Sequence, residues 1–208
     1  MSDQIRNKRL RLLIARLNKE RKKQAKQIDI LCNDLIAAQK DFIKSFKVIG
    51  FAADFYEGIA GLTDLNELLA IAANFIKDQI PDANVAFFLL ANNNFELHIF
   101  ESDQPINPED RRIENFFTAE LVDNIAKANR ICNIDDMLAM GLAGNPCYLE
   151  KVAAVALPLN HLGRSLGLVL VYRSSQKPLA CDEIKCIAQI APGLSRSIFS
   201  CRALINSA

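Results

Sequence analysis

The sequence predicts an α+β fold, in which an antiparallel sheet is flanked by helices and preceded by a long coiled-coil helix. Three observations favour this fold. Apolar residues recur at steps of three and four through residues 10–49, with no proline among them. Further along, two pairs of apolar, strand-like runs are separated by turn-forming residues, as in β-hairpins. Amphipathic helical segments lie before, between and after these pairs.

The heptad repeat is the most informative of these patterns. An apolar stripe that repeats every 3.5 residues stays on one helix face only if the helix supercoils against a partner. β-branched residues at a with leucine at d favour a parallel two-stranded assembly, so we predict a parallel homodimer with residues 1–50 as its dimerisation helix. The alternative is a long helix packed on its own domain. The predicted seam consists of Leu10, Ile14, Leu17, Ile28, Leu31, Leu35, Ala38, Phe42 and Ile49.

Charge is distributed unevenly along the chain. Residues 1–30 hold ten Lys or Arg and three Asp or Glu, whereas the rest of the chain holds 15 bases and 21 acids. A basic helix of this kind could contact nucleic-acid phosphates or a membrane surface. The apolar seam, however, continues through the basic stretch, whereas a zipper-type DNA reader leaves the seam to fork across the duplex. A solvated flank of the coiled coil is therefore favoured over nucleic-acid binding.

Composition also indicates the compartment. No apolar run reaches the ~18 residues needed to span a bilayer, and the polar N-terminus lacks a signal-peptide core. The six cysteines are scattered and form no CxxC pair, which is typical of reduced thiols. We expect a cytoplasmic protein with no membrane span.

The segment after residue 50 is predicted to form one α+β domain. Gly58 or Gly61 is expected to loosen or end the long helix, and Thr63 offers an N-cap for the next helix, which ends near Pro81. The later elements are predicted as strands 85–90 and 95–100, a helix over 113–128, a short strand 130–134, an irregular loop 135–146, strands 151–159 and 165–172 joined through residues 160–164, and a helix 181–205 that Pro192 kinks or deprives of one hydrogen bond.

The C-terminal part resembles a known family. Its order is Val155-Ala-Leu-Pro-Leu159, then Gly163-Arg-Ser-Leu-Gly-Leu-Val-Leu170, then the acid-bearing helix Asp182-Glu-Ile-Lys-Cys-Ile-Ala-Gln-Ile-Ala191. This order and spacing resemble the closing hairpin and helix of the GAF domain, and the helix over 63–80 with the strand after it is similar to that family's opening. The resemblance implies that residues 51–208 form a GAF-like sensor domain, which in this family binds small molecules or senses redox state, dimerises through its first and last helices and is linked by a coiled coil to an output module.

Departures from the family's motifs narrow the expected chemistry. The residue set of cyclic-nucleotide-binding members is absent. Cys147-Tyr148 is similar to the bilin attachment pair of photoreceptor members, but the flanking signature is missing, and only Cys132 and Cys147 lie where reductase members cluster their cysteines. No Ser-His-Asp motif, phosphate loop or HExxH is present, and two isolated histidines predict no metal site. We expect no catalysis, and the cofactor remains unknown.

If a ligand binds, the resemblance and the general character of pockets favour a site between the sheet and residues 110–150. Aromatic side chains would surround a few polar groups there. His98 could point into this pocket, although a locally hydrogen-bonded strand residue is the simpler interpretation, and Asp135 is most simply a turn or cap residue. The candidate ligand-binding residues are His98, Phe100, Phe116, Phe117, Cys132, Asp135, Cys147 and Tyr148.

These patterns predict a non-catalytic, dimeric regulatory module of the GAF type that senses a small molecule or a redox signal. Its output is expected to pass through the N-terminal helix or a partner protein. The competing hypothesis is a coiled-coil scaffold or adaptor whose GAF-like domain is degenerate and binds no ligand.

Overall fold

The computed structural model describes residues 2–91, 94–101 and 112–205. By its internal contacts the chain divides into two compact units, residues 1–47 and residues 48–208.

The first unit is helical throughout its described part. Helix α1 is assigned from Ser2 to Ile59 without interruption, and every described side chain within residues 1–47 is exposed. The predicted seam residues Leu31, Leu35 and Phe42 are 66%, 69% and 70% exposed. In most proteins the stability of a helix comes from packing of an apolar face, and the described part of α1 buries none within this unit. The long helix is thus confirmed, while its pairing into a coiled coil stays a prediction.

A five-stranded antiparallel sheet organises the second unit. The strand order is β2-β1-β5-β4-β3, and each neighbouring pair is antiparallel. This confirms the predicted α+β fold with an antiparallel sheet. The strands are β1 (Asn84–Ala91), β2 (Asn94–Phe100), β3 (Cys132–Asn133), β4 (Val152–His161) and β5 (Arg164–Ser174).

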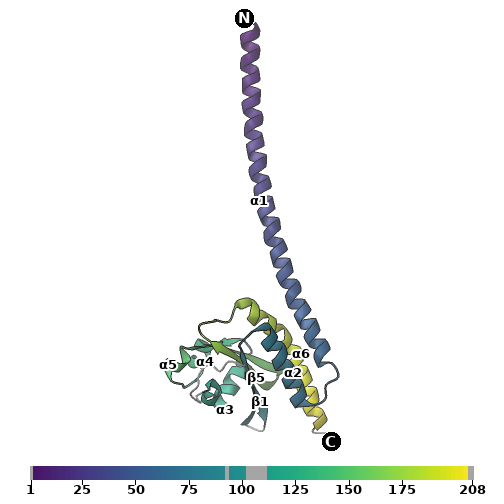
Figure 1. Cartoon of the computed structure of the whole chain (residues 1–208), viewed down its shortest axis with the longest axis vertical. Helices are drawn as coiled ribbons and strands as arrows, with labels where there is room; N and C mark the ends of the chain where they lie inside the picture. The colour runs from purple at the N-terminus through teal and green to yellow at the C-terminus, as the bar shows by residue number, and fades with distance from the viewer. Residues whose placement is uncertain (1, 92–93, 102–111, 206–208) are drawn as a thin grey trace. The chain divides into compact units, whose positions relative to one another are not determined.

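Helices cover both faces of the sheet, because alternate strand residues point to opposite sides. Phe87 belongs to one apolar core and Phe88 to the other. Figure 1 shows α2 and α6 on one side of the sheet and α3, α4 and α5 on the other. The bounds of these helices are α2 (Leu65–Gln79), α3 (Ala119–Ala128), α4 (Ile134–Ala139), α5 (Pro146–Leu149) and α6 (Cys181–Ile205), with a 3₁₀ helix η1 (Ile113–Phe116) before α3.

The last turns of α1 belong to the core on the α2 and α6 side. Phe51, Phe55 and Ile59 are buried there. The Tyr56 hydroxyl donates a hydrogen bond to the carbonyl of Gln189 on α6, at 2.9 Å. The Tyr56 ring lies so close to Gly193 that a Cβ added at Gly193 would be 1.9 Å from Tyr56 Cε1. Close packing of α1 on α6 therefore requires a glycine at position 193.

Helix α1 ends two residues before Gly61, which has a φ of +80°. Glycine adopts this left-handed conformation without the steric cost that a side chain would bring, and it is the usual residue after a helix C-terminus. Gly50 and Gly58 are both helical. Of the two glycines expected to end the helix, Gly61 does so.

The segment 135–146, expected to be an irregular loop, contains short helices. Asn133 and Asp136 form a capping box that starts α4, and Asn145 caps α5 with Pro146 in its first turn. That expectation was wrong because helices of six and four residues are too short to show an apolar period. Helix α2 also starts one residue later than expected, since its N-cap is Asp64 and not Thr63.

The connection between β4 and β5 is shorter than expected. His161 and Arg164 are paired, so the turn consists of Leu162 and Gly163 alone. Their φ values are +49° and +75°, as a two-residue type I′ hairpin requires at both positions. The five-residue connection was expected because leucine, unlike asparagine or glycine, is an uncommon residue at positive φ.

A pair of glycine substitutions tests the contact between Tyr56 and Gly193. We expect Gly193→Ala to lower the free energy of unfolding by about 1–3 kcal/mol, because the new methyl displaces the Tyr56 ring. Gly50→Ala is the matched control: it lies in α1, a Cβ there would meet nothing within 4 Å, and we expect it to raise stability by up to about 1 kcal/mol. Urea unfolding of both variants measures the difference. Equal effects would show that α1 does not pack closely on α6.

Candidate functional site

The most unusual polar group of the globular unit is the carboxyl of Glu114, which is 2% exposed. Glu114 lies on η1, and its Oε1 accepts a hydrogen bond from the hydroxyl of Tyr172 on β5. The other oxygen, Oε2, is buried and has no hydrogen-bond partner among the described residues. Buried carboxyl oxygens are normally paired, so Oε2 marks a place where a ligand or a water can donate.

The electrostatics of this cluster follow from its burial. Loss of hydration raises the pKa of Glu114, and the Tyr172 hydrogen bond opposes this only in part. Burial, followed by the negative charge of Glu114, raises the pKa of Tyr148 on α5 and that of Tyr172. The cluster therefore holds protons tightly when nothing else is bound. A ligand that brings an N–H donor or a positive charge to Oε2 would favour the ionised carboxyl.

Aromatic and apolar side chains surround the Glu114 cluster. The Phe116 ring lies 6.0 Å from the Tyr148 ring, and Phe117 stacks on Phe88 at 4.7 Å between centroids. Cys132 on β3 is buried in the same core, and burial raises the pKa of its thiol. A buried thiol with a raised pKa is a poor nucleophile, so this surrounding favours recognition of a ligand over thiol chemistry.

The structure brings together only part of the predicted site. Phe116, Phe117, Cys132 and Tyr148 pack in or against one core, on the α3 side of the sheet. His98 and Phe100 do not join them: His98 pairs with Phe87 and Phe100 with Val85, and both partners belong to the opposite core. The register of β2 therefore corrects the expectation that His98 points toward the segment 110–150. Asp135 and Cys147 are exposed on α4 and α5, where Asp135 occupies the first turn.

Sequence reasoning missed Glu114 and Tyr172. Glu114 stands among apolar residues of a predicted amphipathic helix, where an acid is ordinarily a solvated residue. No local pattern shows that the segment is a 3₁₀ helix that turns this side chain inward. Tyr172 could have been found, because it alternates with Leu168 and Leu170 on the same face of β5.

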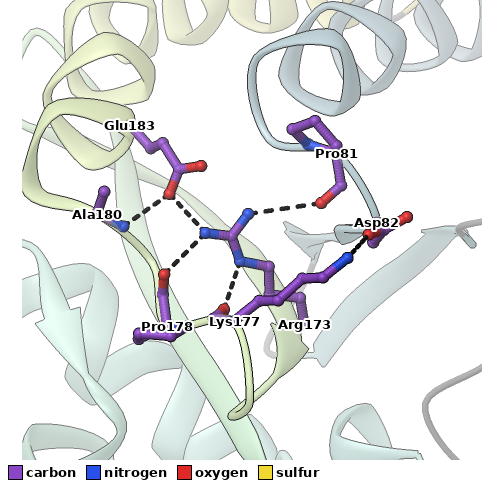
Figure 2. Close-up of polar contacts among 7 residues, drawn as sticks. All are labelled: Pro81, Asp82, Arg173, Lys177, Pro178, Ala180 and Glu183. Carbon is purple, nitrogen blue, oxygen red and sulfur yellow. Dashed lines mark hydrogen bonds and ion pairs between the residues drawn. The ribbon is translucent and has the colours of Figure 1, made fainter.

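A second buried polar group, Arg173, connects three segments on the other side of the molecule. Its side chain is 9% exposed. Figure 2 shows its guanidinium among backbone carbonyls and one carboxylate. Nε donates to Lys177 O at 2.6 Å, Nη2 to Pro178 O at 2.8 Å and to Glu183 Oε2 at 2.7 Å, and Nη1 to Pro81 O at 3.5 Å.

Glu183 completes this cluster at the start of α6. The same oxygen, Oε2, accepts a hydrogen bond from the Ala180 amide at 2.6 Å. Lys177 forms a separate, more exposed ion pair with Asp82 at 2.5 Å (Figure 2). The donors of Arg173 are used for structural contacts, so we assign this cluster the role of fixing α6 to the sheet and to the turn after α2.

The described part of the chain lacks two further features. No group of three His, Cys, Asp or Glu side chains there is arranged to hold a metal ion. No helix among those residues is both long and apolar enough to cross a bilayer.

Comparison with known proteins addresses the fold. No family model matches the sequence, and no curated protein does. Solved structures do: the GAF domain of an Acinetobacter phosphoenolpyruvate-protein phosphotransferase has 13% identity and a TM-score of 0.56, covering 77% of this chain and 98% of that one. The globular part of the chain has a GAF-like fold.

Two further structures agree with this GAF-like fold. The GAF domain of a Coxiella burnetii phosphoenolpyruvate-protein phosphotransferase has 12% identity and a TM-score of 0.55, covering 76% of this chain and 96% of that one. The GAF domain of the cyanobacteriochrome TePixJ has 18% identity and a TM-score of 0.53, covering 70% and 95%. The resemblance found in the sequence is thereby confirmed at the level of the fold.

The raised pKa of Glu114 predicts a pH dependence of stability. Because the folded chain holds this proton more tightly than the unfolded chain, its stabilising effect is complete below the unfolded pKa, near 4.5, and is lost as pH rises through the folded pKa. Glu114→Gln keeps the neutral form at all pH values, so its stability relative to the native chain should improve from about pH 4 to about pH 8. Chemical unfolding at both pH values measures this. Glu120→Gln, an exposed acid of α3, is the control, and the same pH trend in both variants would contradict the prediction.

The Arg173 cluster yields a second prediction. Arg173→Met should lower the free energy of unfolding by about 3 kcal/mol, because it leaves several buried acceptors without donors. Lys177→Met removes an ion pair whose lysine side chain is 65% exposed, and should cost less than about 1 kcal/mol. Thermal or urea unfolding compares them. A small effect of Arg173→Met would show that α6 is held by its apolar contacts alone.

Proposed function

We propose that this chain is a non-catalytic, dimeric regulatory module that senses a small molecule in its GAF-like domain and responds through its N-terminal helix. One observation carries the proposal: helix α1 contains the whole heptad seam and also supplies Phe51, Phe55 and Ile59 to the core of the globular unit. The helix that bears the proposed dimerisation seam is therefore also part of the folded GAF-like domain.

The proposed ligand site is the Glu114 cluster with its aromatic surround. Small-molecule sites are mostly apolar, with a few polar groups that fix the ligand's orientation. The unpartnered Oε2 of Glu114 calls for a ligand that carries an N–H or O–H donor, or a positive charge. A redox signal is less well supported, because burial raises the pKa of Cys132, Cys186 and Cys201, and thiols without thiolate character oxidise slowly.

Transmission requires that the helix have two arrangements, since a ligand shifts an equilibrium only by binding its two states with different affinity. Three further positions of the same heptad stripe hold the polar residues Arg21, Gln24 and Ser45. Polar residues at a and d positions reduce stability in exchange for register, and they leave a second arrangement close in energy. The output would be read from the paired helices by a partner protein.

The solved structures of similar fold support a sensory or regulatory role. One is the GAF domain of a cyanobacteriochrome, and two are GAF domains of phosphoenolpyruvate-protein phosphotransferases. The competing hypothesis of a ligand-free scaffold draws on a different observation, the closely packed aromatic core around Phe88 and Phe117. In that case the GAF-like domain would serve only to position the coiled coil.

Seam substitutions test the assembly. Replacing Leu31 and Leu35 together with Asp would bury paired charges between the helices, so we expect monomers of 23.2 kDa in sedimentation equilibrium. The matched control replaces Leu12 and Ile30 with Asp. Both residues are exposed in α1 but lie off the seam, and this variant should remain a dimer. A seam variant that stays dimeric would show that the chain dimerises through the helices that flank the GAF-like domain.

A further inference from the structure

A second candidate site lies on the opposite face of the sheet from Glu114. A cavity of about 230 Å³ opens to solvent between the end of β4, the segment 129–131 and one side of α6. It exists because β3 pairs only with Val155 and Ala156, so β4 has no outer strand beyond Ala156 in the part of the chain described. Leu157, Pro158, Ala188 and Ala191 supply its apolar surface.

Asn160 lines this cavity, and its side chain carries an unsatisfied acceptor. Its Nδ2 donates to Ala126 O at 3.3 Å and to Asn129 Oδ1 at 2.9 Å. Two oxygen acceptors on one side fix the orientation of the amide, so the atom on the other side is the oxygen. That atom, Oδ1, is buried and lacks a donor among the described residues. A buried amide oxygen without a donor costs free energy, which a donor on a bound molecule would recover.

Two further polar groups border the cavity. Pro192 has no amide hydrogen, so the Ala188 carbonyl one turn earlier receives no helical hydrogen bond from position 192. Arg130 has a side chain that is 57% exposed, and one of its nitrogens, Nη2, donates to Asp136 at 2.7 Å. A guanidinium has five N–H donors, so Arg130 keeps donors for an anion at the cavity mouth.

We infer that this cavity binds a small organic acid whose apolar body carries an N–H or O–H donor. The donor is recognised by Asn160 Oδ1, the carboxylate by Arg130, and the body by the apolar surface of β4 and α6. This site is separate from the Glu114 cluster and goes beyond the function proposed above. The position of the cavity suits a regulatory role. Pro192 borders the cavity, and the next residue, Gly193, packs against the Tyr56 ring of α1.

Titration of the full-length chain with indole-3-acetate tests this inference, since that probe combines an N–H donor, an apolar ring and a carboxylate. Amide resonances of Asn160, Ala191 and Ser195 should shift in a saturable manner. Indole-3-acetamide lacks the charge and 1-methylindole-3-acetate lacks the donor, and each should bind about tenfold more weakly. No saturable shift at these residues, or equal affinity for all three compounds, would overturn the inference.

Two variants with matched controls locate the site. Ala191→Leu fills the cavity and should abolish probe binding, whereas Ala53→Leu, on an exposed position of α1, should leave it unchanged. Arg130→Gln should weaken binding about tenfold, whereas Arg164→Gln in the hairpin should not. Thermal unfolding checks that each variant is folded. Binding that survives both Ala191→Leu and Arg130→Gln would refute the site. Binding lost only in Glu114→Gln would assign the probe to the Glu114 cluster and refute this site as well.

Discussion

The burial of the last turns of α1 in the core of the globular unit is the constraint on which the remaining features depend. Phe51, Phe55 and Ile59 form part of the same apolar layer as α2 and α6. Burial of three large apolar side chains contributes several kcal/mol, at about 1.5–3 kcal/mol for each. The helix therefore cannot leave this layer without exposing the core. Its N-terminal seam, by contrast, has no apolar surface of its own unit to bury against.

Position 193 shows how closely this layer is packed. Tyr56 lies over Gly193, and the residue before it, Pro192, withholds an amide hydrogen from Ala188. Helix α6 thus contacts α1 at Gly193, and it borders the candidate organic-acid cavity at Pro192. The Arg173 cluster fixes the start of α6 to the sheet, so movements of α6 would occur nearer its middle, where its backbone hydrogen bonding is weakest. The proposed Glu114 site lies on the other face of the sheet, where the Tyr172 hydroxyl of β5 donates to its carboxyl.

Much of the fold was predictable because its signals are local and periodic. The continuous apolar run from Val85 to Leu90 indicates a strand, and the heptads of α1 indicate a helix. The short helices α4 and α5 were missed because a single turn has no period. The two-residue turn at Leu162 and Gly163 was missed because leucine seldom adopts positive φ.

The site was less predictable than the fold. The place of Tyr148 and Phe117 in one core was expected from where the family binds its ligands, and their role in binding stays a prediction. His98 was assigned to the wrong face because pairing register is set by long-range contacts. Glu114 carries no sequence signal, since only the 3₁₀ turn makes it a buried acid.

The claim that the core controls the seam is tested most directly by pulsed electron paramagnetic resonance on the proposed dimer. A spin label at Lys19→Cys, off the seam of α1, would be introduced in a chain whose exposed cysteines Cys32, Cys147 and Cys181 are replaced with Ser. Displacing Tyr56 by Gly193→Ala should shift the distribution of distances between the two labels, whereas Gly50→Ala should leave it unchanged. Identical distributions in the labelled parent chain, in Gly193→Ala and in Gly50→Ala would contradict the claim. Helix α1 would then be a static dimerisation helix, as the scaffold hypothesis has it.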